Sequence, residues 1–151
     1  MHLFSVLVFY CSNVWANTTS KNLNKLQSVQ NFACRIVSSA RKCDHVTPFL
    51  KYINWLLVTT QLYYRSASMA FKCMTGRVPT YISSQFIKRQ DVSNRNTRNS
   101  QQLNIPLLKT ATGQRTFYQK IVSIWNSLGA SWKCFDSVNS FKRCLRQKLL
   151  K

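Results

Sequence analysis

The chain has 151 residues, 45% of them hydrophobic, which is enough for one domain with a buried core. Its 22 Lys and Arg outnumber 3 acidic residues, giving a formal net charge of +19 at pH 7, while Gly and Pro are too scarce for a turn-rich β fold. The three acids, Asp44, Asp91 and Asp136, are widely spaced, which argues against the carboxylate pairs of two-metal or glycosidase chemistry. We therefore expect a non-catalytic chain that needs no cofactor.

The first predicted element is a short apolar run from Leu3 to Cys11, too short for a membrane span. It is typical either of a core segment or of a signal peptide, with a cleavage site after Ala16 and a glycosylation sequon at Asn17. Against secretion, only His2 and no Lys or Arg precedes the run, and cleavage would leave an odd number of cysteines. The location stays open, with an intracellular protein favoured over a secreted one.

Helices are predicted in the first half of the chain by apolar side chains that recur at three- and four-residue spacing. The first covers about residues 21–41, with Ser20 as its N-cap. A longer helix is predicted from Val58 to Thr75, and Gly76 is expected to end it. Shorter helices are expected at residues 47–53 and 79–86.

A polar basic segment, residues 88–102, separates two helical parts, 1–87 and 103–151, which together are compatible with a single domain. The segment has few apolar side chains and cannot bury a face, so we predict an exposed loop or linker. Its cations are candidate contacts to phosphate, although a merely solvated loop fits the pattern equally well. These cations are Lys88, Arg89, Arg95 and Arg98.

Beyond the loop, a small β-hairpin is predicted to pair residues 103–106 with 115–118. Apolar spacing predicts helices from Phe117 to Ser127 and from Ser137 to Leu150. The last helix has one apolar face and cations elsewhere, a pattern typical of helices that bind nucleic acid, lie on membranes or are simply solvated. Its candidate phosphate contacts are Lys142, Arg143, Arg146 and Lys148. The predicted fold is mainly α, an irregular helical bundle with a small β-hairpin around residues 103–118.

The six cysteines show no spacing typical of a zinc site, so we expect no metal. Cys34, Cys73 and Cys144 fall within apolar helical stretches and are predicted to be small buried side chains. His45 lies beside a turn without an oriented partner and is interpreted as structural.

Several short motifs, in their order along the chain, resemble the C-terminal region that follows the palm in LINE-type non-LTR retrotransposon reverse transcriptases. The strongest is Trp125-Asn126-Ser127-Leu128, which is similar to a Trp-Asn-Ser-Leu-Pro signature with Gly129 in place of proline. The resemblance runs from about Tyr10 to the end of the chain. The other motifs are the stretch from Tyr10-Cys11 to Trp15 with Leu23 to Ile36, Trp55-Leu56, Gly76 with Pro79, Tyr81 and Ile82, the stretch from Arg95 to Ser100, and Phe141-Lys142 with Leu145.

The resemblance implies a truncated fragment, because the family's catalytic Asp-Asp element would lie upstream and no catalytic residue carries over. What it implies instead is a thumb-like and tail region that supports binding of template and primer. Together with the charge, it favours a non-catalytic remnant that binds RNA or DNA nonspecifically. A surface left by the missing palm is expected to favour self-association. The alternatives are a secreted or membrane-surface cationic protein, and a transposon-derived reading frame with no selected function.

Overall fold

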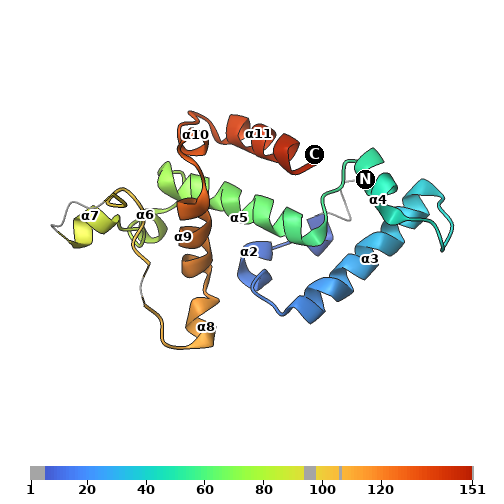
Figure 1. The fold of residues 1–151 in the computed structure, drawn as a ribbon, viewed down its shortest axis with the longest axis horizontal. Helices are drawn as coiled ribbons and strands as arrows, with labels where there is room; N and C mark the ends of the chain where they lie inside the picture. The colour runs from blue at the N-terminus through green and yellow to red at the C-terminus, as the bar shows by residue number, and fades with distance from the viewer. Residues whose placement is uncertain (1–5, 94–97, 106, 151) are drawn as a thin grey trace. The chain divides into compact units, whose positions relative to one another are not determined.

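A computed structural model describes residues 6–93, 98–105 and 107–150 of the chain (Figure 1). The described chain is mainly helical, as predicted. It forms two compact units: unit 1 comprises the described parts of Met1–Tyr64 and Arg143–Lys151, and unit 2 comprises those of Arg65–Lys142. The boundaries expected from composition, at residues 87 and 102, both fall within unit 2, and the three-part domain division stays a prediction.

The helices of unit 1 follow the predicted order. They are α2 (Ser12–Trp15), α3 (Ser20–Ser38), α4 (Val46–Tyr52), the first part of α5 (Val58–Met74) and most of α11 (Val138–Leu150). The N-cap of α3 is Thr19 and not the predicted Ser20, because Thr19 is the last residue with extended backbone. The helix ends at Ser38, earlier than predicted, because Ser39 adopts a left-handed conformation with a φ of 52°.

Two small apolar clusters and the side-chain amides of Gln27 and Gln30 hold unit 1 together. One cluster contains Phe9, Ala16, Val58 and Leu62, and the other contains Cys34, Val46 and Leu50, where α4 packs on α3 (Figure 1). The Gln30 Nε2 donates to the Leu56 carbonyl at 2.8 Å, and the Gln27 Oε1 accepts from the Val58 N–H at 2.9 Å. Since the first amides of a helix lack partners within it, the side chain of Gln27 satisfies the start of α5.

Unit 2 contains the rest of α5, which Gly76 follows with a left-handed φ of 66°, as its role as a stop signal requires. Next come α6 (Thr80–Ser83), α7 (Arg89–Val92), α8 (Ala111–Gln114), α9 (Phe117–Ser127) and α10 (Ala130–Lys133). Helix α9 has the predicted bounds. Helix α6 is shorter than the predicted 79–86, because tight turns such as the Phe86 N–H to Ser83 carbonyl bond follow it. None of the described helices is both long and apolar enough to cross a bilayer.

The β-hairpin predicted around residues 103–118 is wrong. Helix α8 and the start of α9 occupy part of that segment, and Leu103 instead forms an isolated antiparallel bridge with Lys88. Two hydroxyl caps favour helix over strand: the Thr110 side chain accepts from the Gly113 N–H, and the Thr116 side chain accepts from the Gln119 N–H. Residue 106, at the end of one predicted strand, lies outside the described residues.

The core of unit 2 is built from aromatic rings. Phe71 on α5 and Phe141 on α11 are both fully buried and stack with their centroids 4.5 Å apart. Trp132 and Phe135 each meet the Phe141 ring edge-on at 6.0 Å, and Trp125 lies 6.5 Å from Phe71. Offset stacked and edge-to-face pairs of this kind add to the free energy gained by burying the rings, so α5 and the start of α11 are firmly joined in this unit.

Candidate nucleic-acid interface

The basic segment 88–102, predicted as an exposed loop or linker, has backbone hydrogen bonds at its base. The Arg89 N–H donates to the Gln102 carbonyl at 2.9 Å, and the Asn104 N–H donates to the Ile87 carbonyl at 2.8 Å. The scarcity of apolar side chains predicted exposure but could not reveal pairing between backbone groups. The cations near this base therefore project from an ordered support.

Asn126 anchors the end of this segment to α9. Its Oδ1 accepts from the Leu103 N–H at 3.0 Å, and its Nδ2 donates to the Leu103 carbonyl at 3.0 Å. Leu103 itself is buried, and the Tyr118 hydroxyl donates to the carbonyl of the next residue, Asn104, at 3.2 Å. The asparagine of the Trp-Asn-Ser-Leu word thus has a structural role, because it completes the hydrogen bonds of a buried backbone unit.

The predicted cations of the segment differ in their surroundings. Lys88 is exposed, with its Nζ 3.5 Å from the Gln101 Oε1, and Arg89 is half-buried on α7. Arg98 is exposed in a turn, whereas Arg95 lies outside the described residues. The described part of the segment therefore presents two exposed cations and one partly covered one.

Helix α11 has the predicted amphipathic character. Its residues Val138, Phe141 and Leu145 are buried, and Leu149 is half-buried. The apolar face is therefore used within the fold, and the other side of the helix carries the cations.

Three of the four candidate cations of α11 share one side of the helix. Arg146 is four residues after Lys142 and three after Arg143, which places it between them on the helix surface, whereas Lys148 follows Arg146 by two residues and points elsewhere. Lys142 is half-buried in unit 2, and the other three are exposed in unit 1. Arg146 already donates from Nη2 to the Asn54 carbonyl at 3.1 Å, although a guanidinium keeps further N–H donors.

Sequence reasoning missed two cations, Arg65 and Lys72, which lie beside Lys142 in unit 2. Arg65 and Lys72 are seven residues apart on α5, which places them on the same side of that helix. Lys72 and Lys142 follow the two stacked rings, Phe71 and Phe141, in the sequence, and the charge of Lys72 acts on Lys142. We call Arg65, Lys72 and Lys142 the cationic cluster.

The positive charges of Lys72 and Arg65 both act on Lys142. The pKa of Lys142 is lowered by burial of its ammonium, and further by the like charges of Lys72 and Arg65. Grouped cations repel each other in the free protein, whereas an anionic phosphate among them would be attracted by all three. The seven-residue spacing on α5 was visible in the sequence, but the approach of Lys142 depends on the tertiary ring stack.

The three acidic residues and His45 differ in their surroundings. The Asp44 Oδ2 accepts from the Arg41 N–H at 2.8 Å, which fixes the turn after α3, while Asp91 and Asp136 are exposed. Within residues 6–93, 98–105 and 107–150, no group of three His, Cys, Asp or Glu is placed to hold a metal ion. His45 is exposed and immediately precedes α4.

The cysteines divide by burial. Cys34 and Cys73 are buried, as predicted, and burial raises the pKa of the Cys73 thiol to about 11. Cys144 is only half-buried, because it lies at the flank of the apolar face of α11 and not at its centre.

The described cations thus form two surfaces suited to phosphate. One is the base of the segment 88–102, and the other is the cationic cluster; both lie in unit 2, whereas Arg143, Arg146 and Lys148 belong to unit 1. Both offer charged donors to phosphate, and the segment 88–102 also contains the exposed carboxylate of Asp91. Comparison with protein-family models, with curated proteins and with solved structures finds no match to this chain.

Proposed function

We propose that this chain is a non-catalytic module that binds RNA or DNA through its basic surface, without sequence preference. The observation that carries the proposal is the cationic cluster, in which Arg65, Lys72 and Lys142 gather beside the Phe71–Phe141 stack. Each phosphate neutralised by such a side chain releases condensed counterions, which favours binding. Contacts to phosphate carry no information about the base, so no sequence preference is expected.

We propose further that the module is a remnant of the C-terminal region of a LINE-type reverse transcriptase. The Trp125-Asn126-Ser127-Leu128 motif, on which this resemblance mainly rests, also contributes to the core of unit 2. The Trp125 ring lies 6.5 Å from the Phe71 ring, the Asn126 side chain accepts a hydrogen bond from the Leu103 N–H, and Leu128 is buried. A remnant that keeps these contacts keeps the scaffold that positions the cations, while the separated acids offer no catalytic pair.

The proposal is tested by fluorescence anisotropy with labelled oligonucleotides of two unrelated sequences over a range of salt concentrations. Affinity is expected to fall with salt, with a slope of about −0.7 to −0.9 for each phosphate neutralised, and equally for both sequences. Lys72→Gln with Lys142→Gln is expected to reduce the slope by roughly 1 for each lysine removed. A chain that fails to bind either oligonucleotide at low salt would refute the function.

The matched control changes the same amount of charge elsewhere. Lys21→Gln with Lys25→Gln removes two exposed lysines from α3, which lies in unit 1. A localised site predicts a larger loss from the Lys72 and Lys142 pair than from this control. Equal losses would leave only a diffuse attraction to a polycation and would remove the cluster from the binding surface.

If the protein is secreted, the mature chain is expected to lack residues 1–16. Phe9 and Ala16 belong to the same buried cluster as Val58 and Leu62. Cleavage after Ala16 would remove two members of this cluster from unit 1. The intact mass of the chain purified from cells distinguishes the two hypotheses, because the nucleic-acid-binding module proposed here retains residues 1–16.

A further inference from the structure

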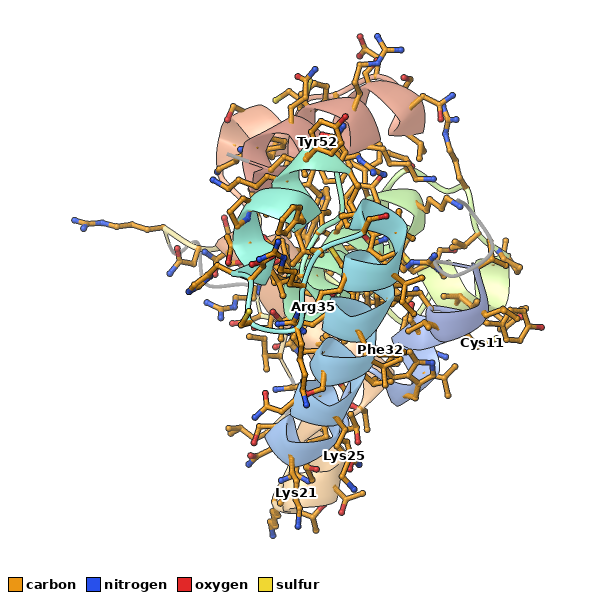
Figure 2. All side chains as sticks on the ribbon, turned by 90° about the vertical axis from the view of Figure 1, so that its right-hand side faces the viewer. Cys11, Lys21, Lys25, Phe32, Arg35 and Tyr52 are labelled. Carbon is orange, nitrogen blue, oxygen red and sulfur yellow. The ribbon has the colours of Figure 1, made fainter. Side chains whose placement is uncertain are left out.

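Helix α3 carries a second apolar stripe that faces away from the interior of unit 1. Val29, Phe32 and Ile36 are 52%, 65% and 64% exposed, respectively. Figure 2 shows Lys21, Lys25 and Phe32 following one another along the same side of this helix. Apolar side chains gathered on a soluble surface commonly mark a contact with a partner. Lys21, Lys25, Val29, Phe32 and Ile36 are named here the outward face of α3.

The orientation of α3 is fixed by its opposite side, so the helix cannot rotate to bury these residues. Gln30 and Cys34 are buried there, and the Gln30 amide donates to the Leu56 carbonyl. Gln27 adds its hydrogen bond to the Val58 N–H. Turning the outward face inward would break both bonds and bury two lysines, each of which is costly.

The spacing of the outward face matches the seam of a helix pair. Lys25, Val29, Phe32 and Ile36 are separated by four, three and four residues, the alternation by which one helix packs along another. Arg35 does not extend this face, because its Nη2 is directed to the Asp44 carbonyl, 3.5 Å away. The face is therefore apolar toward the C-terminal end of α3 and basic toward its N-terminal end.

The net charge of the chain distinguishes between the candidate partners of the outward face of α3. A second copy would bring another net charge of +19, and the only acidic side chain in unit 1, Asp44, is already engaged with the Arg41 N–H. Nucleic acid gains nothing from aliphatic Val29 and Ile36. A helix of another protein satisfies both halves of the face, provided that acidic residues lie opposite the two lysines.

We propose that the outward face of α3 is a docking surface for an acidic amphipathic helix of another protein. That helix presents apolar residues at heptad spacing to Val29, Phe32 and Ile36, and Asp or Glu residues to Lys21 and Lys25. The docking surface is separate from the cationic cluster, and it does not require the chain to bind nucleic acid.

The test uses the full chain and two synthetic helical peptides of about three heptads, long enough to form a helix on contact. Both peptides carry Leu at the core positions; the first has Glu at the flanking positions and the second has Lys. Isothermal titration is expected to detect binding of the Glu peptide alone. Phe32→Ala with Ile36→Ala is expected to weaken it at least tenfold, and Lys21→Gln with Lys25→Gln to weaken it and reduce its salt dependence.

Two controls keep the outcome specific. Leu107→Ala removes a fully exposed apolar side chain from unit 2, and Lys72→Gln with Lys142→Gln removes two lysines from the cationic cluster. Neither change is expected to alter binding of the Glu peptide, and circular dichroism checks that every variant keeps its helical content. Conversely, the changes at Phe32 and Ile36 are expected to leave oligonucleotide binding unchanged, so the two proposals fail independently.

Several results would overturn the docking surface. They are absence of binding by the Glu peptide, equal binding of both peptides, and equal losses in the Leu107 variant. Dimerisation of the chain alone in sedimentation experiments, abolished by Phe32→Ala, would identify a second copy as the occupant. Binding to phosphatidylserine vesicles that depends on Phe32, without binding of the Glu peptide, would identify a lipid surface.

Discussion

Helices α3 and α11 both combine regularly spaced apolar residues with cations, yet they use them differently. In α11 the apolar residues Val138, Phe141 and Leu145 are buried, and the remaining surface is basic. In α3 the buried side contains Gln30 and Cys34, while an additional apolar stripe remains outside. The exposed surface of α11 therefore offers a partner mainly charge, whereas α3 also offers exposed apolar area. The first arrangement suits phosphate and the second suits protein.

The largest expected effect is the difference in the free energy of unfolding between Phe→Ala substitutions in α11 and in α3. Phe141→Ala removes a fully buried ring that contacts Phe71, Trp132 and Phe135, and we expect it to lower the free energy of unfolding by about 3–5 kcal/mol. Phe32→Ala removes an exposed ring, and we expect a change within about 0.5 kcal/mol. Urea unfolding of both full-length variants, followed by circular dichroism, measures the difference.

Comparable losses from the two variants would contradict the contrast, because they would mean that Phe32 is covered in the free chain. Retention of wild-type stability by the Phe141 variant would show that the aromatic core of unit 2 does not depend on α11. Either result would also weaken the corresponding proposal, since the cationic cluster needs the ring stack and the docking surface needs an exposed Phe32.

A smaller effect is expected at the buried amide of α3. Gln30→Ala leaves the Leu56 carbonyl without its side-chain donor, and we expect a loss of about 1–3 kcal/mol in the free energy of unfolding. Gln147→Ala removes an exposed amide from α11 and is the matched control, with an expected change within about 0.5 kcal/mol. A neutral Gln30 variant would mean that the orientation of α3 is not fixed by this bond, and the outward face would lose its main structural support.

The difference between α3 and α11 also shows what the sequence can reveal. The spacing of apolar residues predicted α9 with its correct bounds and located both α3 and α11, because helical periodicity is a local property. It could not predict which apolar stripe of α3 is buried. That choice depends on Gln27 and Gln30 bonding to the residues before and at the start of α5, well apart along the chain.

The candidate site was predictable in its charge and not in its geometry. The exposed position of Lys88, Arg98, Arg143 and Arg146 followed from their polar or amphipathic surroundings. The hydrogen bonds at the base of the segment 88–102 could not be predicted, because they join backbone groups and do not depend on the composition of the side chains. The hairpin prediction was wrong because Thr110 and Thr116 cap the helices α8 and α9, and such caps favour helix over strand.

The smallest expected effect distinguishes a cationic cluster from isolated surface cations. Lys142→Gln removes a charge that is disfavoured in the fold by partial burial and by the like charges of Lys72 and Arg65, so we expect the free chain to become slightly more stable even as it binds nucleic acid more weakly. Arg143→Gln removes an exposed neighbouring charge and is expected to leave stability nearly unchanged. A Lys142 variant that is less stable than the wild type would contradict the repulsion.

The dependence of this effect on pH follows from the direction of the pKa shift. The pKa of Lys142 is lower in the folded chain than in the unfolded chain, because of burial and the like charges of Lys72 and Arg65. Between those two values the unfolded chain binds more protons, so this lysine makes stability rise with pH in that alkaline window. Burial raises the pKa of Cys73 to about 11, which acts in the opposite direction, since the unfolded thiol ionises first. The wild type and the Lys142→Gln variant both contain Cys73. The difference between their free energies of unfolding therefore reports the contribution of Lys142 alone. We expect the advantage of the variant, measured by urea unfolding, to shrink as pH rises through the lowered pKa of Lys142; a constant advantage would mean that the lysine does not titrate differently in the fold.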